Sequence, residues 1–260
     1  MDILYDANTF VGHWPFRQII NSTPQELRSL LESYGIKKAL TANINNIFYK
    51  DAHSGNQELV EMIANDRDFF SGVAILNPTY MAWERDLERC VNDFGFKALR
   101  LVPQYHDYKI DDTECLAICE KAAKLDIPVL ISPSMVDPRQ KHWMDTGESI
   151  SFKQICELAE KVDKLRIVCS AFLIDNKDYD CLSKTNYRER IFFDTSRCMR
   201  SAFYQFLAYG VGKLGAGQFL YGSNAPLRGI SPSVLELDCA DLPDAEKGII
   251  ACQTFDKLFG

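Results

Sequence analysis

Several patterns that define common classes of protein are missing from this sequence. No apolar run approaches the ~18 residues that a membrane-spanning helix needs. No block of basic residues stands out, and the net charge of −7 argues against nucleic acid as a partner. The chain starts with a strand-like run and shows no charged and apolar regions of a signal peptide. These absences predict a cytoplasmic protein without a membrane or nucleic-acid partner.

Motifs of metal, redox and nucleotide sites are also missing. The nine cysteines include no Cys-x-x-Cys pair, and their odd number and scattered spacing indicate reduced, buried thiols. Cys115 and Cys119 lie one helical turn apart, but inside an amphipathic segment where both are expected to face the core. No Gly-x-Gly-x-x-Gly follows a strand, and no Gly-x-Ser-x-Gly occurs. A dinucleotide fold and nucleophilic catalysis therefore have no direct support.

The sequence does contain a regular alternation of strand and helix signals. Short apolar runs predict eight strands, at residues 3–5, 36–42, 70–76, 97–102, 127–131, 166–169, 190–195 and 218–221. Helical spacing predicts helices at 24–34, 56–64, 81–94, 112–125, 152–162 and 244–258, with a short or irregular helix within 175–188. Thr23 is the expected N-cap of the first helix, and Gly35 ends it. Eight such units without a linker predict a single (β/α)8 TIM barrel over residues 1–260, in preference to a doubly wound sheet.

The stretch after the first predicted strand, residues 6–17, contains small polar residues followed by Gly12 and Pro15. We expect it to be a loop at the carboxyl end of the barrel, where this fold places its chemistry. The segment Asp-Ala-x-x-x-x-Gly at 6–12 resembles the opening of the amidohydrolase superfamily, in its amidohydrolase-related (type 2) branch. Residues 96–101, 128–132 and 221–226 resemble the fourth, fifth and eighth strands of the same family.

The resemblance implies a barrel that holds a divalent metal, but this chain departs from it at each ligand position. Asn8 and Phe10 stand where the family has His-x-His, and Ser132 stands where its fifth strand ends in His. The position of the family's sixth-strand His falls near Ser170, where this chain has no histidine, and the family's eighth-strand Asp is replaced by Asn224. Asn binds divalent metal weakly and accepts no proton, Phe cannot ligate, and Ser is a poor zinc ligand. We therefore predict a protein without a metal or another cofactor.

The four histidines, at positions 13, 53, 106 and 142, all fall in segments expected at the carboxyl face of the barrel. A single loop histidine is more often solvated than catalytic, but four on one face favour a role for at least one. His106, which lies between two tyrosines, is a candidate general acid or base near neutral pH, as are His142 and His13.

Arg100 lies inside a predicted strand, where a cation needs a partner. Alternation with the apolar Leu99 and Leu101 places Arg100 in the barrel interior. A salt bridge with Asp6 or Asp194 explains this cation nearly as well as a substrate carboxylate does, and both aspartates also suit a role in fixing neighbouring loops. Arg17, Arg139 and Arg228 also carry planar guanidinium donors, which suit a carboxylate or a phosphate. The candidates for substrate binding are Asn8, Arg17, Arg100, Tyr108, Arg139 and Asn224.

Two functions from different classes remain open. The first is a metal-independent hydrolase or lyase, of the lactonase or decarboxylase type, acting on a small carboxylated metabolite. The second is a degenerate, non-catalytic barrel that binds a small ligand or a partner, which a pocket filled by Phe10, Trp14 and Phe172 would favour. Apolar residues in the predicted loops, namely Trp14, Trp143 and Met144, further predict a homodimer.

Overall fold

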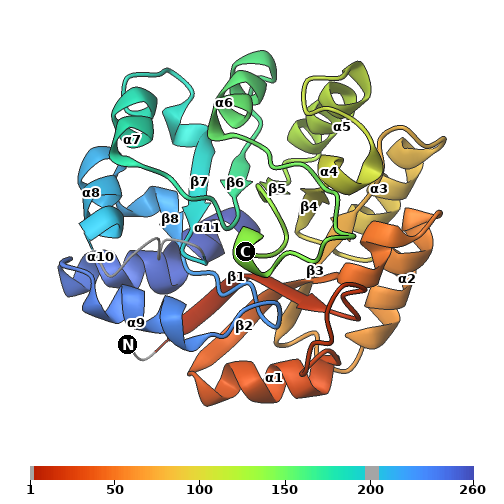
Figure 1. Cartoon of the computed structure of the whole chain (residues 1–260), viewed down its shortest axis with the longest axis horizontal. Helices are drawn as coiled ribbons and strands as arrows, with labels where there is room; N and C mark the ends of the chain where they lie inside the picture. Colours follow the sequence, from red (N-terminus) through yellow and green to blue (C-terminus); the bar gives the residue numbers. More distant parts are fainter. Residues whose placement is uncertain (1–2, 197–204) are drawn as a thin grey trace.

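A computed structural model describes residues 3–196 and 205–260 and places eight parallel strands in one sheet, in chain order (Figure 1). The strands are β1 (Leu4–Val11), β2 (Ile36–Asn43), β3 (Phe70–Ile75), β4 (Ala98–Leu101), β5 (Val129–Ile131), β6 (Ile167–Cys169), β7 (Ile191–Asp194) and β8 (Phe219–Leu220). Hydrogen bonds from Ala7 N to Tyr221 O (3.0 Å) and from Phe10 N to Ala225 O (2.8 Å) join the first strand to the last. The predicted (β/α)8 TIM barrel is confirmed.

The helices form a ring around the strands (Figure 1). They are α1 (Pro24–Ser33), α2 (Ala52–Met62), α3 (Trp83–Asn92), α4 (Pro103–His106), α5 (Thr113–Lys124), α6 (Phe152–Lys161), α7 (Asn176–Leu182), α8 (Gln205–Leu214), α9 (Ser231–Cys239), α10 (Asp244–Gly248) and α11 (Thr254–Phe259). Thr23 and Glu26 form the expected capping box at the start of α1. The sequence patterns did not predict α4, α8 and α9, and the predicted last helix is divided into α10, a π-helical segment (Ile249–Gln253) and α11.

The prediction that β1 ends at Tyr5 is wrong, because the strand continues to Val11. Its polar residues are accommodated by a register irregularity between Asp6 and Thr9. Thr9 Oγ1 donates to the carbonyl oxygen of Leu40 on β2 at 2.6 Å. Thr9 therefore has a partner inside the sheet, and the loop begins only at Gly12, whose φ of +97° suits glycine.

Two hydrophobic clusters follow the alternation of side chains along the strands. The outer cluster lies between the strands and the helices, and the inner cluster fills the barrel with residues such as Val73, Leu130 and Val168. At the end where the strands begin, α11 closes the barrel, with its Phe255 ring 5.4 Å from that of Tyr5. The barrel is therefore a packed core that leaves only its carboxyl end for a site.

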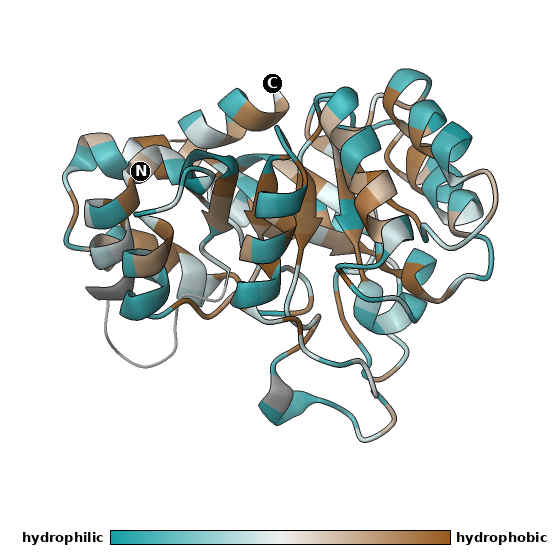
Figure 2. Ribbon diagram, turned by 90° about the horizontal axis from the view of Figure 1, so that it is seen from above, coloured by the Kyte–Doolittle hydropathy of each residue, from teal (hydrophilic) through white to brown (hydrophobic). Residues whose placement is uncertain are grey.

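The long segment between β5 and α6, residues 132–151, covers part of that carboxyl end. Met135 and Val136 are buried in the inner cluster. The part that carries η2 (Pro138–Gln140) extends away from the strands (Figure 2). Farther along the segment, Trp143 and Met144 are 83% and 56% exposed.

Within the described residues, no helix is both long enough and apolar enough to cross a membrane. Eight of the nine cysteines lie in this part of the chain and are free thiols, and Cys198 lies outside it.

Candidate functional site

Arg100 is the centre of a buried polar network at the carboxyl end of the barrel. The β4 side chains alternate as predicted, so that Arg100 points into the barrel and is 1% exposed. Its Nη1 donates to Ser132 Oγ at 3.0 Å, and its Nη2 donates to Asn8 Oδ1 at 2.8 Å. Its guanidinium carbon lies 4.7 Å from the centre of the Phe10 ring, in cation–π contact. Neutral groups on β1 and at the end of β5 thus hold one cation.

The network extends from Arg100 to the carboxylate of Asp194. Asn8 Nδ2 donates to Ser196 Oγ at 3.2 Å, and Ser196 Oγ donates to Asp194 Oδ1 at 2.6 Å. The N–H of Ala171 donates to the same oxygen at 2.8 Å. Burial raises the pKa of Asp194, and the nearby charge of Arg100 counteracts that rise. Arg100 and Asp194 are therefore linked through two neutral side chains and by their charges.

The sequence left open a salt bridge between Arg100 and Asp6 or Asp194. No direct ion pair joins Arg100 to either carboxylate in the described part of the chain. Burial lowers the pKa of Arg100 to about 10, and the charge of Asp194 raises it. The guanidinium accordingly stays positive at neutral pH, and its charge is balanced at longer range.

Asp6 is a second buried carboxyl group, at the junction between β1 and β8. Its Oδ1 accepts hydrogen bonds from the backbone N–H groups of Asn8 and Ser223, each at 3.0 Å. Its Oδ2 is buried and has no hydrogen-bond partner among the described residues. Burial raises the pKa of Asp6 to about 7, and the charge of Asp194 contributes to the rise. Asp6 can therefore exchange a proton near neutral pH.

The residues at the expected metal-ligand positions do not fit a divalent metal. Asn8, Phe10 and Ser132 all contact the Arg100 guanidinium, so a metal ion there would meet a positive charge. Asn224 donates through its Nδ2 to the carbonyl oxygen of Met135 at 3.3 Å. Its φ of +61° is a conformation that Asn tolerates better than most residues. The described residues also contain no group of three His, Cys, Asp or Glu side chains placed to hold a metal.

The three histidines proposed as catalytic lie apart from this network. His106 is buried on α4, with its Nε2 3.0 Å from the carbonyl oxygen of Ile47, and burial lowers its pKa to about 4. His13 is exposed, and its backbone N–H donates to Asn45 Oδ1 at 2.7 Å. His142 is exposed too, and its ring lies 6.2 Å from that of Phe16. His106 is therefore neutral at physiological pH and paired with the backbone.

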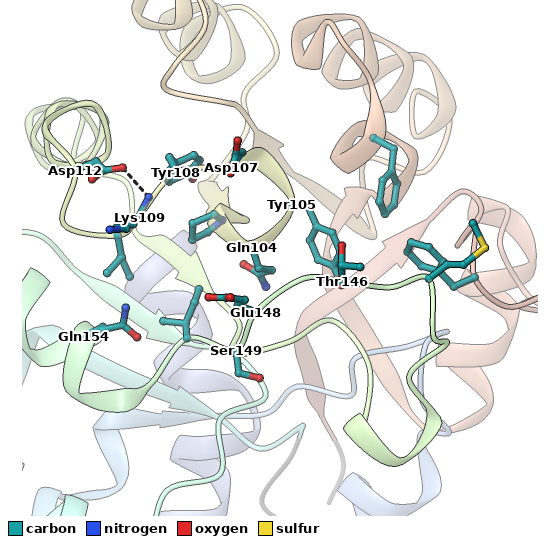
Figure 3. A pocket seen from close by; sticks show the side chains of 16 residues that line it. Gln104, Tyr105, Asp107, Tyr108, Lys109, Asp112, Thr146, Glu148, Ser149 and Gln154 are labelled. Atoms are coloured by element: carbon teal, nitrogen blue, oxygen red, sulfur yellow. Dashed lines mark hydrogen bonds between the residues drawn. The ribbon is translucent and has the colours of Figure 1, made fainter.

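A cavity of about 700 Å³ opens beside α4, between residues 103–112 and residues 144–154 (Figure 3). Tyr108, a predicted substrate-binding residue, lies in its wall, and Tyr105 donates from there to the buried carboxylate of Asp145 at 3.1 Å. Gln104 also lies in the wall and donates through Nε2 to the carbonyl oxygen of Ser132 at 3.2 Å. Gln104 thus connects the cavity wall to Ser132, which is a partner of Arg100.

A second cavity, of about 570 Å³, contains the other predicted arginines. Arg17 and Arg139 line it together with Arg228, next to the start of α9. The structure therefore divides the predicted substrate-binding residues into three places. Asn8, Arg100 and Asn224 lie buried in the barrel, Tyr108 lies in the first cavity, and Arg17 and Arg139 lie in the second.

These features define a TIM barrel with a buried cationic network where the strands end. The amidohydrolase family model Amidohydro_2 matches residues 20–170, and the chain belongs to this amidohydrolase family. A search of curated proteins found no match.

Solved structures share the fold over the whole chain at low sequence identity. A 5-carboxyvanillate decarboxylase from Sphingomonas paucimobilis has a TM-score of 0.76 and 14% identity, covering 100% of this chain and 99% of its own. A dihydroxybenzoic acid decarboxylase from Polaromonas, solved with manganese and 2-nitroresorcinol, has a TM-score of 0.74 and 17% identity, with coverages of 100% and 97%. A probable 2-pyrone-4,6-dicarboxylic acid hydrolase from Acinetobacter baumannii has a TM-score of 0.71 and 15% identity, covering 100% of both chains.

Proposed function

We propose that this protein is a metal-independent hydrolase or lyase that acts on a small carboxylated metabolite. The observation that carries the proposal is the fully buried Arg100, which is held by neutral partners at the carboxyl end of the barrel. Its Nε has no hydrogen-bond partner among the described residues, so the guanidinium retains a donor for a ligand. A planar carboxylate matches such a donor and would pair directly with a cation that Asp194 balances only at longer range.

In this proposal the chain's own residues supply orientation and proton transfer. Asn8 and Ser132 fix the guanidinium plane, because each accepts one of its N–H groups. Asp6 is the proposed general base, since its pKa of about 7 suits proton transfer at neutral pH better than that of His106, at about 4. In the opening of a lactone, the base takes a proton from the attacking water, whose oxygen bonds to the carbonyl carbon. The ring C–O bond then breaks, and its oxygen receives the proton that the base took. A metal ion has no part in these steps.

The structural relatives support the class of substrate. Their names include 5-carboxyvanillate and 2-pyrone-4,6-dicarboxylic acid, which are small carboxylated compounds, and decarboxylation and hydrolysis as reactions. The buried cation of this chain is suited to the carboxylate that such compounds share. The class of reaction is therefore proposed from the family and the fold. Metal independence is proposed because Asn8, Ser132 and Asn224 bind Arg100 and Met135 and do not form a set of metal ligands.

A specific observation also favours the second candidate, a non-catalytic barrel that binds a small ligand or partner. Met135 and Val136 are buried in the inner cluster, and the Met135 carbonyl accepts the side-chain N–H of Asn224. The segment between β5 and α6 thereby covers the network. Phe10 and Trp14 are buried in the inner cluster as well, whereas Phe172 belongs to the outer one and fills no part of the barrel.

The two candidates can be separated with metal-free protein. We expect protein treated with EDTA, and shown by elemental analysis to lack zinc and manganese, to turn over a lactone dicarboxylate or a hydroxylated aromatic acid at an unchanged rate. Turnover that EDTA abolishes and zinc or manganese restores would refute metal independence. Saturable binding of the same compounds, detected by calorimetry without any turnover, would establish the non-catalytic barrel instead.

We further propose that residues 1–260 act as one domain in the cytoplasm, where the free thiols stay reduced, and that the protein is a homodimer. The exposed Trp143 and Met144 provide apolar area for a second copy. Light scattering at micromolar concentration is expected to return twice the 29.6 kDa mass of one chain. A measured mass equal to that of one chain contradicts the homodimer.

A further inference from the structure

The second cavity, of about 570 Å³, concentrates positive charge outside the barrel. We call it the arginine cavity, after Arg17, Arg139 and Arg228, which line it. Leu30 of α1 and Tyr34, which follows that helix, form another part of its wall, so the cavity lies along the outer side of the barrel next to α1 and α9. It is separate from the interior that holds Arg100.

Two of these three arginines have no direct ion pair within the described residues. Arg17 donates through Nη1 to Gln140 Oε1 at 2.9 Å and through Nη2 to the Leu227 carbonyl oxygen at 2.6 Å. Arg228 donates through Nη1 to the carbonyl oxygen of Ser196. Neutral acceptors hold both guanidinium groups in position and leave their charges without a bound carboxylate. Each guanidinium also keeps further N–H groups, because arginine carries five.

Asp137 is the carboxylate in the wall of this cavity, and it binds Arg139. Arg139 donates to both of its carboxylate oxygens, through Nε at 3.1 Å and through Nη2 at 2.7 Å. Burial raises the pKa of the buried Glu236 on α9 to about 7, although the nearby charge of Arg228 counteracts that rise, so Glu236 is only partly ionised at neutral pH. Three guanidinium groups thus exceed the negative charge around them.

The first turn of α9 adds to the positive potential. Ile230 and Pro232 line the arginine cavity, and the nine-residue helix that begins at Ser231 has no side-chain cap. Pro232 has no N–H group, and the N–H groups of Ser233 and Val234 donate to the carbonyl oxygen of Ile230, so this helix end attracts anions through its dipole. The arginine side chains and the dipole of this helix therefore both favour an anion in the arginine cavity.

From this arrangement we propose that the arginine cavity binds an oxyanion, the phosphate or carboxylate group of a small metabolite. Arg17 and Arg228 are the main ligands, since their positions are fixed and their charges are not neutralised by a direct ion pair. Arg17 also joins three segments of the chain, because it binds Gln140 after β5 and Leu227 after β8 from its own position after β1. Binding of an anion there is expected to order the same three segments.

The experiment titrates the complete protein with inorganic phosphate and, separately, with malonate, followed by calorimetry at low salt. We expect saturable binding of at least one of the two anions. The anion with the lower dissociation constant identifies phosphate or carboxylate as the preferred group. Arg17→Gln and Arg228→Gln should each weaken binding about tenfold or more, because a charge-assisted hydrogen bond contributes roughly 1.5–3 kcal/mol. Arg85→Gln, on the exposed face of α3, is the matched control and should leave binding unchanged.

Two results would overturn the proposal. One is the absence of saturable binding of either anion, and the other is binding that Arg17→Gln and Arg228→Gln leave unaltered. Circular dichroism and the melting temperature of each variant show that it is folded before it is titrated. Since the titration measures binding without turnover, its outcome is independent of whether Arg100 takes part in a reaction.

Discussion

The Arg100→Met protein is expected to lose about 3–5 kcal/mol of its free energy of unfolding, the usual cost of removing one member of a buried charged network. Methionine fills much of the same volume but donates no hydrogen bond. Asn8 Oδ1 and Ser132 Oγ would each lose a donor in the interior, and Asp194 would lose the cation that favours its ionised form. Urea denaturation at neutral pH measures the difference.

Two further variants make this test specific to the buried charge. Arg85→Met, on the surface of α3, is the matched control and should change the free energy of unfolding by no more than about 0.5 kcal/mol. Combining Arg100→Met with Asp194→Asn should recover part of the loss, because the second change removes a buried carboxylate whose ionised form Arg100 favours. An Arg100→Met protein as stable as the control would show that the network does not depend on its cation.

The strands could be predicted because each one is a short apolar run with its own local signal. The exception is instructive. Residues 6–11 read as a loop because they are polar and precede Gly12, yet they form most of β1. A strand next to an irregular register can satisfy polar side chains, as Thr9 does with Leu40, and no local pattern shows that the partner is there.

The candidate site was predicted only in part, because burial and distant pairing are properties of the folded chain. Alternation along β4 was enough to place Arg100 inside the barrel. Its contact with Asn8 joins residues 92 positions apart, which no spacing rule gives. His106 lies between tyrosines as expected, but its burial on α4 lowers its pKa to about 4, so it is a much weaker base than an ordinary histidine.

Asp6 was the residue whose chemistry was underestimated. Its place after a short apolar run suggested a carboxylate that fixes a loop. The structure encloses it between β1 and β8, where its Oδ1 accepts two backbone N–H groups and its Oδ2 has no hydrogen-bond partner in the described part of the chain. The signal available in the sequence was a second acidic residue, Asp194, at the end of another strand, since its charge adds to the rise in the pKa of Asp6 that burial causes.

The pH dependence of stability follows from the raised pKa of Asp6. In the folded protein the pKa is about 7, against 3.8 for an ordinary aspartate. Between these values the folded state binds more protons than the unfolded state, so stability falls as pH rises, by up to about 1.4 kcal/mol per pH unit. His106 acts in the opposite direction, because its lowered pKa makes stability rise with pH between about 4 and 6.5. The pH profile of the wild-type protein alone therefore does not isolate Asp6.

The difference in unfolding free energy between Asp6→Asn and wild type does isolate it. Asparagine keeps the acceptor for the N–H groups of Asn8 and Ser223 but carries no titrating proton. Relative to wild type, the variant should gain stability as pH rises from about 4 to about 7, by roughly 4 kcal/mol in total if the full shift is expressed. Asp163→Asn, at an exposed position, provides the comparison without a buried carboxyl group. Urea denaturation at each pH gives both differences. A flat difference for Asp6→Asn would mean that the pKa of Asp6 is not raised in the folded protein, and the role in proton transfer that rests on this raised pKa would be contradicted.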